Sequence, residues 1–133
     1  MLCSYPKYDF CLYKGEDKEL FFTFSYKNDD GTTVPMKLDG CTFEMSIALK
    51  ASKQKIDKLT SENERLVVGI LDGGAFKQMD TNASALQAIF PHNVTEKFPE
   101  GKAEFDLLKT DSIGQREVLL TGGITIHSGV SYA

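Results

Sequence analysis

Hydrophobic and polar residues alternate along much of this chain, most clearly between residues 101 and 127. Ala103, Phe105 and Leu107 are separated by acidic residues, which is the period of a strand with one buried face. Turn-forming residues occupy 111–115, and a second run of aliphatic residues follows them. We therefore expect a long hairpin near the C-terminus, with earlier strands packed onto it.

Earlier segments show the same alternation, with Gly, Pro, Asn and Asp between them. Pro35 limits one segment to a short edge piece, because proline cannot donate a ladder hydrogen bond. Gly122 and Gly123 predict a bulge or bend inside the last strand. The earlier predicted strands are Tyr8–Leu12, Leu20–Tyr26, Val34–Leu38, Phe43–Leu49, Leu66–Leu71, Phe76–Met79 and Ser84–Phe90.

Residues 48–66 fit two different structures. Two strands joined by a loop at 60–63 would put Gln54, Ile56 and Lys58 on one face. A lysine-rich amphipathic helix is the alternative, because apolar residues recur at spacings of seven and three: Leu49, Ile56, Leu59 and Leu66. We favour strand, loop and strand, because the run that follows is strongly β and short strands connect tightly.

One helical turn is expected before the C-terminal hairpin. Asn93 can cap a turn that runs from Val94 to Lys97, and Glu96 occupies the capping-box position. Pro99 and the glycine that follows shortly after it end this turn and lead into the hairpin.

These segments predict about eight or nine short antiparallel strands with frequent turns, a pattern typical of a β-sandwich. The length of 133 residues suits one domain. We therefore predict an all-β fold: a single immunoglobulin-like β-sandwich that spans residues 1–133 and includes one short helical turn. Residues 1–6 and 128–133 are expected to be flexible or contact arms.

Composition argues against several classes of partner. The net charge of −4 gives no basic excess for nucleic-acid binding, and no apolar run is long enough to span a membrane. Pro6, Lys7 and Asp9 interrupt the N-terminal region, which therefore lacks the pattern of a secretory signal. We expect synthesis in the cytoplasm, without nucleic-acid or membrane partners.

The three cysteines, Cys3, Cys11 and Cys41, are odd in number and form no C-x-x-C motif. Cytoplasmic synthesis favours free thiols. Cys11 and Cys41 fall within strand patterns, so we expect both to be small buried side chains. A Cys3–Cys11 disulfide is the alternative.

Residues that carry chemistry are few and scattered. His92 and His127 are far apart in sequence without partners at metal-ligand spacing, so we expect both to be solvated. Neither a nucleophile elbow nor a phosphate-binding loop is present, and Asn28–Asp30 lacks the distal glutamate of a calcium loop. We therefore expect no catalytic, cofactor-binding or metal-binding residues and no enzyme activity. Acidic pairs fall in turn-like stretches, as expected of solvated loops: Glu16–Asp17, Asp29–Asp30 and Glu62/Glu64.

Four lysines form a small basic face: Lys50, Lys53, Lys55 and Lys58. Aromatic residues do not interleave with them, which argues against binding of single-stranded nucleic acid. Lysines on an edge strand prevent pairing with another sheet, and we expect that role here.

The order of turns and strands carries a resemblance. A KGED turn precedes an aromatic strand at Lys14–Tyr26, and VPMKLDG leads into the strand after Cys41. ERLVVGI forms a later strand, and the last hairpin begins GKAEFDLLKTD and ends GGITIHSG. From Phe10 to Ser128 the chain thus resembles small β-sandwich proteins of bacteriophage virions, found in tail baseplates, fibre-attachment modules and accessory proteins. Ser84–Phe90 is additional to the simplest form of this pattern.

The resemblance implies a non-enzymatic structural protein of the virion, made in the cytoplasm of the host bacterium. It would assemble with copies of itself and with tail, baseplate or capsid proteins, and no catalytic residues carry over. Two alternatives remain: a head decoration protein, and a carbohydrate- or receptor-binding module. The binding module would stack sugars on exposed rings, for which the candidates are Tyr5, Tyr8, Tyr13 and Tyr132.

Overall fold

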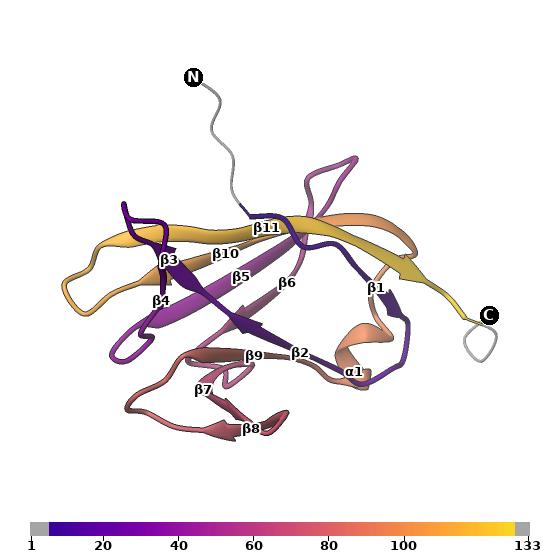
Figure 1. Cartoon of the computed structure of the whole chain (residues 1–133). Helices are drawn as coiled ribbons and strands as arrows, with labels where there is room; N and C mark the ends of the chain where they lie inside the picture. Colours follow the sequence, from indigo (N-terminus) through magenta and orange to yellow (C-terminus); the bar gives the residue numbers. More distant parts are fainter. Residues whose placement is uncertain (1–5, 130–133) are drawn as a thin grey trace.

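The computed structural model describes residues 6–129, and strands dominate it (Figure 1). A five-stranded sheet has the order β1 (Phe10–Tyr13), β11 (Arg116–His127), β10 (Gly101–Thr110), β5 (Thr42–Leu49) and β6 (Lys55–Thr60). A four-stranded sheet has the order β2 (Lys18–Thr23), β9 (Ala85–Phe90), β7 (Leu66–Asp72) and β8 (Ala75–Gln78). A small hairpin pairs β3 (Ser25–Lys27) with β4 (Thr33–Pro35), and the one short helix is α1 (His92–Thr95). The prediction of an all-β fold is confirmed.

The predicted C-terminal hairpin lies at the centre of the larger sheet. β10 pairs with β11 on one side and with β5 on the other, while β1 lies along the outer side of β11. The backbone N–H of Asp111 donates to the carbonyl oxygen of Gln115 at 2.9 Å and closes the turn. Earlier strands therefore do pack onto this hairpin, as the sequence predicts.

Both the direction and the number of strands differ from the prediction. β1 runs parallel to β11, with Phe10 beside Ile124, whereas all strands were expected to be antiparallel. Alternation along a strand tells which face is buried, but it does not tell which partner the strand meets or in which direction. The described residues form eleven strands instead of eight or nine, and β10 and β11 are long, at ten and twelve residues.

The predicted strand Leu20–Tyr26 is in fact two strands, β2 and β3, which belong to different sheets. The chain leaves the four-stranded sheet at Phe24, whose carbonyl oxygen accepts the N–H of Met36 at 2.8 Å. The Lys109 ammonium on β10 then donates to the Tyr26 hydroxyl at 3.3 Å, which links the small hairpin to the larger sheet. Tyr26 is therefore 48% exposed instead of contributing to the core.

The bulge in the last hairpin is not at Gly122 and Gly123, which pair regularly with β10. The register instead shifts beside Leu107 and Leu108, opposite an extra residue at Leu119. Gly122 has a different purpose, since a Cβ atom there would lie 1.8 Å from the carbonyl oxygen of Tyr8. The glycine lets the N-terminal segment cross close to the sheet.

Residues 48–66 form strand, loop and strand, which confirms the favoured interpretation. The predicted face is wrong, however, because the pairing of β5 with β6 shifts beside Ile47 and leaves Ile56 as the extra residue. This shift turns Leu59 into the core and Lys58 outward, so Ile56 and Lys58 do not share a face. Gln54 precedes the strand.

The helical turn is present, but its cap is not the predicted one. Pro91 occupies the N-cap and Glu96 the C-cap, so Asn93 lies inside α1 and no capping box forms. The turn after β1 supplies the cap instead: the Asp17 carboxylate accepts the backbone N–H of His92 at 2.7 Å. The fully buried Thr95 hydroxyl donates to the carbonyl oxygen of Glu16 at 2.8 Å.

The inward faces of the two larger sheets share one hydrophobic core. Phe10 of β1 lies against Phe90 of β9, with ring centroids 5.8 Å apart, and also against Phe105 of β10. The short helix closes one end of this arrangement (Figure 1). The predicted arms lie largely outside the described residues, which include only Pro6, Ser128 and Gly129 of them. Core residues with no exposed surface include Leu12, Leu38, Met45, Ile47, Leu59, Leu86 and Leu107.

Candidate functional site

The two histidines are placed differently from one another. The His92 side chain is 61% exposed and its Nδ1 lies 3.1 Å from a carboxylate oxygen of Asp17, which fits the predicted solvated position. His127 is half-buried, and its ring lies 5.1 Å from that of Tyr13, so it is less exposed to solvent than predicted. Between residues 6 and 129, no three His, Cys, Asp or Glu side chains are grouped so as to hold a metal ion.

Cys11 is exposed, which contradicts its predicted burial. Its neighbours Phe10 and Leu12 point into the core, so the alternation of β1 turns Cys11 outward. Cys41 is half-buried and free, and burial raises the pKa of its thiol. Cys3, and with it the alternative disulfide to Cys11, lies outside the described residues.

Acidic side chains in the turns hold the chain together. Asp39 accepts the backbone N–H groups of Asn82 and Ala83 at 2.7 and 2.8 Å, and these two bonds lower the pKa of its carboxyl group. Asp30 accepts from the hydroxyl and backbone N–H of Thr32, which lowers its pKa in the same way. These carboxylates close turns, so their role is to stabilise the fold.

The four lysines lie at the open side of the larger sheet. Lys55 and Lys58 belong to β6, the edge strand, and Lys50 and Lys53 lie in the turn before it. Lys53 is paired with Glu104, and Lys58 with Glu44 at 2.6 Å. The predicted position on an edge strand is confirmed for Lys55 and Lys58 and is wrong for Lys50 and Lys53, which lie in the connection between β5 and β6.

An ion pair that the sequence analysis missed joins the two sheets. Asp57 and Arg65 form a two-pronged contact at 2.7 and 2.6 Å, and their side chains are only 10% and 15% exposed. Arg65 also donates to the carbonyl oxygen of Ile89 at 3.1 Å and lies over the Phe90 ring. The sequence pattern did not predict this ion pair, because the bulge at Ile56 changes which residues of β6 face inward.

The first candidate surface is apolar and covers the outer side of the four-stranded sheet. Phe21 of β2 and Phe76 of β8 come from its opposite edges, yet their rings approach to 5.5 Å. They meet above two small residues on the strands between, Ala85, which is fully buried, and Gly69. A Cβ at Gly69 would lie 2.7 Å from the Phe76 ring, so the glycine makes room for this ring.

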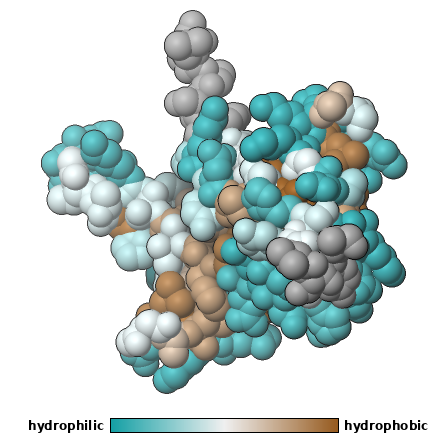
Figure 2. Space-filling view, turned by 90° about the vertical axis from the view of Figure 1, so that its right-hand side faces the viewer, coloured by the Kyte–Doolittle hydropathy of each residue, from teal (hydrophilic) through white to brown (hydrophobic). Residues whose placement is uncertain are grey.

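Phe21 and Leu71 are each 42% exposed. We call Phe21, Leu71 and Phe76 the apolar face. Figure 2 shows apolar atoms gathered low on the visible side of the molecule, at the height of the four-stranded sheet in Figure 1. Alternation along β2 places Phe21 on the side of Thr23, opposite the buried Leu20 and Phe22.

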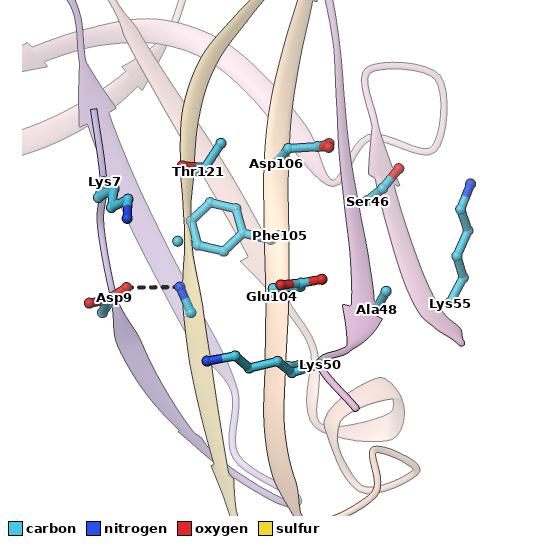
Figure 3. A pocket seen from close by; sticks show the side chains of 13 residues that line it. Lys7, Asp9, Ser46, Ala48, Lys50, Lys55, Glu104, Phe105, Asp106 and Thr121 are labelled. Atoms are coloured by element: carbon cyan, nitrogen blue, oxygen red, sulfur yellow. Dashed lines mark hydrogen bonds between the residues drawn. The ribbon is translucent and has the colours of Figure 1, made fainter. Parts of the chain in front are cut away.

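The second candidate surface is a hollow of about 570 Å³ on the outer side of the five-stranded sheet (Figure 3). The hollow forms because few side-chain atoms cover the sheet at this point. Ser46 and Ala48 on β5 have small side chains, and Gly123 on β11 has none. We call it the outer hollow. Charged residues surround the floor, three basic and three acidic: Lys7, Lys50, Lys55, Asp9, Glu104 and Asp106.

Two of the three acids in the outer hollow already have partners. Asp9 accepts the backbone N–H of Gly123 at 2.8 Å, and Glu104 is paired with Lys53. No hydrogen bond or ion pair joins the side chains of Lys7, Lys50 or Asp106 to another residue within 6–129. These groups are available to a ligand.

The tyrosines proposed as a sugar platform lie elsewhere. Tyr8 and Tyr13 are 41% and 51% exposed, but Tyr8 stacks on Phe10 and Tyr13 lies against His127. Neither lines the outer hollow. Tyr5 and Tyr132 fall outside the described residues.

Neither a scan against protein-family models nor a search of curated proteins found a match. Within residues 6–129, no helix has the length and apolar character needed to cross a bilayer.

Proposed function

We propose that this chain is a non-enzymatic structural protein of a bacteriophage particle. In this proposal the two sheets form an immunoglobulin-like β-sandwich, which packs against copies of itself and against tail, baseplate or capsid proteins. The support is the resemblance of the turn and strand order to phage virion proteins, together with a shared core between two sheets and an apolar face.

The apolar face is the observation that carries the proposal. Charged and polar residues normally occupy the outer side of a sheet that faces water. Here Phe21 and Leu71 each leave 42% of their surface exposed, and a third apolar residue, Phe76, lies beside them. Contiguous apolar patches of this kind mark surfaces that are covered by a partner.

Edges and faces of the sheets offer different opportunities for assembly. Lysines protect the β6 edge against strand addition, so contact through a face is favoured over contact through that edge. A face that packs on an identical face gives a closed, two-fold pair, whereas a face that meets a different surface gives rings or open arrays. Both kinds of contact occur in symmetric particles. In this proposal the protein is made in the host cytoplasm and then becomes part of such a particle.

The proposal is tested by mass spectrometry of purified particles of the phage that encodes this chain. We expect the chain to be present at a fixed copy number relative to the major capsid protein. A number near that of the capsid protein would indicate head decoration, and a much smaller one would indicate the tail or baseplate. Absence of the chain from mature particles would contradict the proposal.

The outer hollow favours a second candidate, the carbohydrate-binding module. Ligand sites are concave and carry a few convergent polar groups. The apolar face has no part in this function, so the two candidates predict effects of different residues.

A further inference from the structure

We propose that the outer hollow binds a saccharide. The proposal deepens the second candidate function and moves its site from the tyrosines to the outer side of the five-stranded sheet. It is independent of assembly, because the apolar face lies on the other sheet. Failure of one proposal therefore leaves the other standing.

The chemistry of the lining is suited to hydroxyl groups. A sugar hydroxyl both donates and accepts, so it is best held between an ammonium group and a carboxylate. The outer hollow supplies both kinds of group, with Lys7 and Lys50 as donors and Asp106 as an acceptor that has no other partner within residues 6–129. The hydroxyls of Ser46 and Thr121 add two groups that can take either part.

The balance of charge argues against a polyanion or a metal ion as the ligand. Three basic and three acidic side chains line the outer hollow, so their formal charges cancel. A phosphate or other polyanion would need an excess of basic groups, and a metal ion would need grouped carboxylates, which residues 6–129 do not provide. A neutral or singly charged, hydroxyl-rich ligand meets neither obstacle.

The shape of the floor permits one face of a sugar ring to approach the sheet. Ala48 and Gly123 leave the backbone of β5 and β11 uncovered, and charged side chains stand around them (Figure 3). In this view Lys7 lies at one rim and Lys55 at the opposite rim, while Lys50 extends toward β11. The volume of about 570 Å³ falls within the usual range for small-molecule sites.

The test is titration of the isotope-labelled protein, followed by backbone amide NMR. Three probes are added separately, each up to about 50 mM, which covers millimolar affinity: maltose, glucuronate and inorganic phosphate. We expect at least one sugar to shift the amides of Ser46, Glu104, Asp106 and Thr121 in a saturable way, while phosphate leaves them unchanged. A response to both sugars indicates a neutral saccharide, and a response to glucuronate alone indicates an acidic one.

Two variants and a control locate the binding. Ala48→Leu fills the floor and Asp106→Ala removes the free acceptor, so each should weaken the affinity for the sugar at least about tenfold, a loss of about 1.4 kcal/mol. Glu19→Ala removes an exposed carboxylate from the other sheet and should leave affinity unchanged. Dispersed amide spectra show that each variant is folded. Asp106→Ala remains informative if the leucine disturbs β5.

Three results would overturn the proposal. The first is that no probe shifts these amides. The second is that phosphate shifts them as strongly as glucuronate does, which would make the lysines a simple anion site. The third is that binding survives both Ala48→Leu and Asp106→Ala unchanged, which would place the ligand elsewhere.

Discussion

Asp57 and Arg65 form the least exposed ion pair among the residues that the structure describes. Removal of one partner leaves the other charge poorly hydrated, which costs far more than the net contribution of the pair. We expect Asp57→Ala to lower the free energy of unfolding by about 3 kcal/mol, measured by urea denaturation.

The matched control for this pair is Asp72→Ala. It breaks the exposed contact between Asp72 and Lys77, whose side chains are 64% and 61% exposed. Exposed pairs contribute little, so this change should cost less than about 1 kcal/mol. If Asp57→Ala and Asp72→Ala lowered the free energy of unfolding equally, Arg65 would not be effectively buried.

Gly122 provides a second prediction at the residue scale. Gly122→Ala would bring a Cβ atom within 1.8 Å of the Tyr8 carbonyl oxygen, which is backbone and cannot turn aside. We expect a loss of about 2 kcal/mol or more in unfolding free energy. The adjacent Gly123→Ala would place its Cβ 3.5 Å from a side-chain oxygen of Asp9 and 3.9 Å from the Ala103 carbonyl oxygen, both ordinary contact distances, and should be tolerated. Similar stability of the two variants would contradict the close approach.

Connections between elements depend on carboxylates in turns. Asp39 joins the turn before β5 to the segment before β9 by accepting two backbone N–H groups, and its pKa is lowered below the ordinary value of 3.8. The folded state thus favours the charged form. The stability that Asp39 contributes is complete above its ordinary pKa and is lost as the pH falls through the lowered value.

The pH dependence gives a prediction for this connection. Asp39→Ala should lower the melting temperature at neutral pH, and the difference from the wild type should shrink as the pH falls below about 4. Thermal unfolding followed by circular dichroism at a series of pH values measures both. Asp106→Ala, which removes no such backbone bonds, is the control. A difference that stays constant down to strongly acidic pH would contradict this role.

For the whole molecule, the apolar face predicts self-association. The double variant Phe21→Ser/Phe76→Ser should sediment as a monomer at concentrations where the wild type forms larger species. Ile113→Ser removes a residue that is 83% exposed in the turn between β10 and β11, so it controls for apolar exposure outside the face. Equal sedimentation of the double variant and the wild type would exclude the apolar face as the contact between copies.

The sequence supports strong predictions where one face of a strand is buried. In β10, Ala103, Phe105 and Leu107 alternate with acids, and both the strand and its inward residues agree with the structure. Alternation carries no information about partners, so the parallel pairing of β1 and the division at Phe24 could not be read from it.

The candidate surfaces depend on effects between strands and were therefore harder to predict. The bulge at Ile56 moves Asp57 to the inner side, where it meets Arg65, and a bulge shifts every later residue to the other face. Phe21 and Phe76 are distant in sequence and meet only because small residues separate them on the sheet. The outer hollow likewise arises from small residues on two different strands, β5 and β11.

The most direct test of the assembly role is incorporation of variants into particles. Phage lacking the chromosomal copy of this chain would be grown in cells that supply the wild type, Phe21→Ser/Phe76→Ser or Ile113→Ser, and purified particles would be quantified by mass spectrometry. We expect the wild type and Ile113→Ser at the same copy number and the double variant to be absent or strongly depleted. Equal incorporation of all three, or absence of the wild type, would contradict assembly through the apolar face.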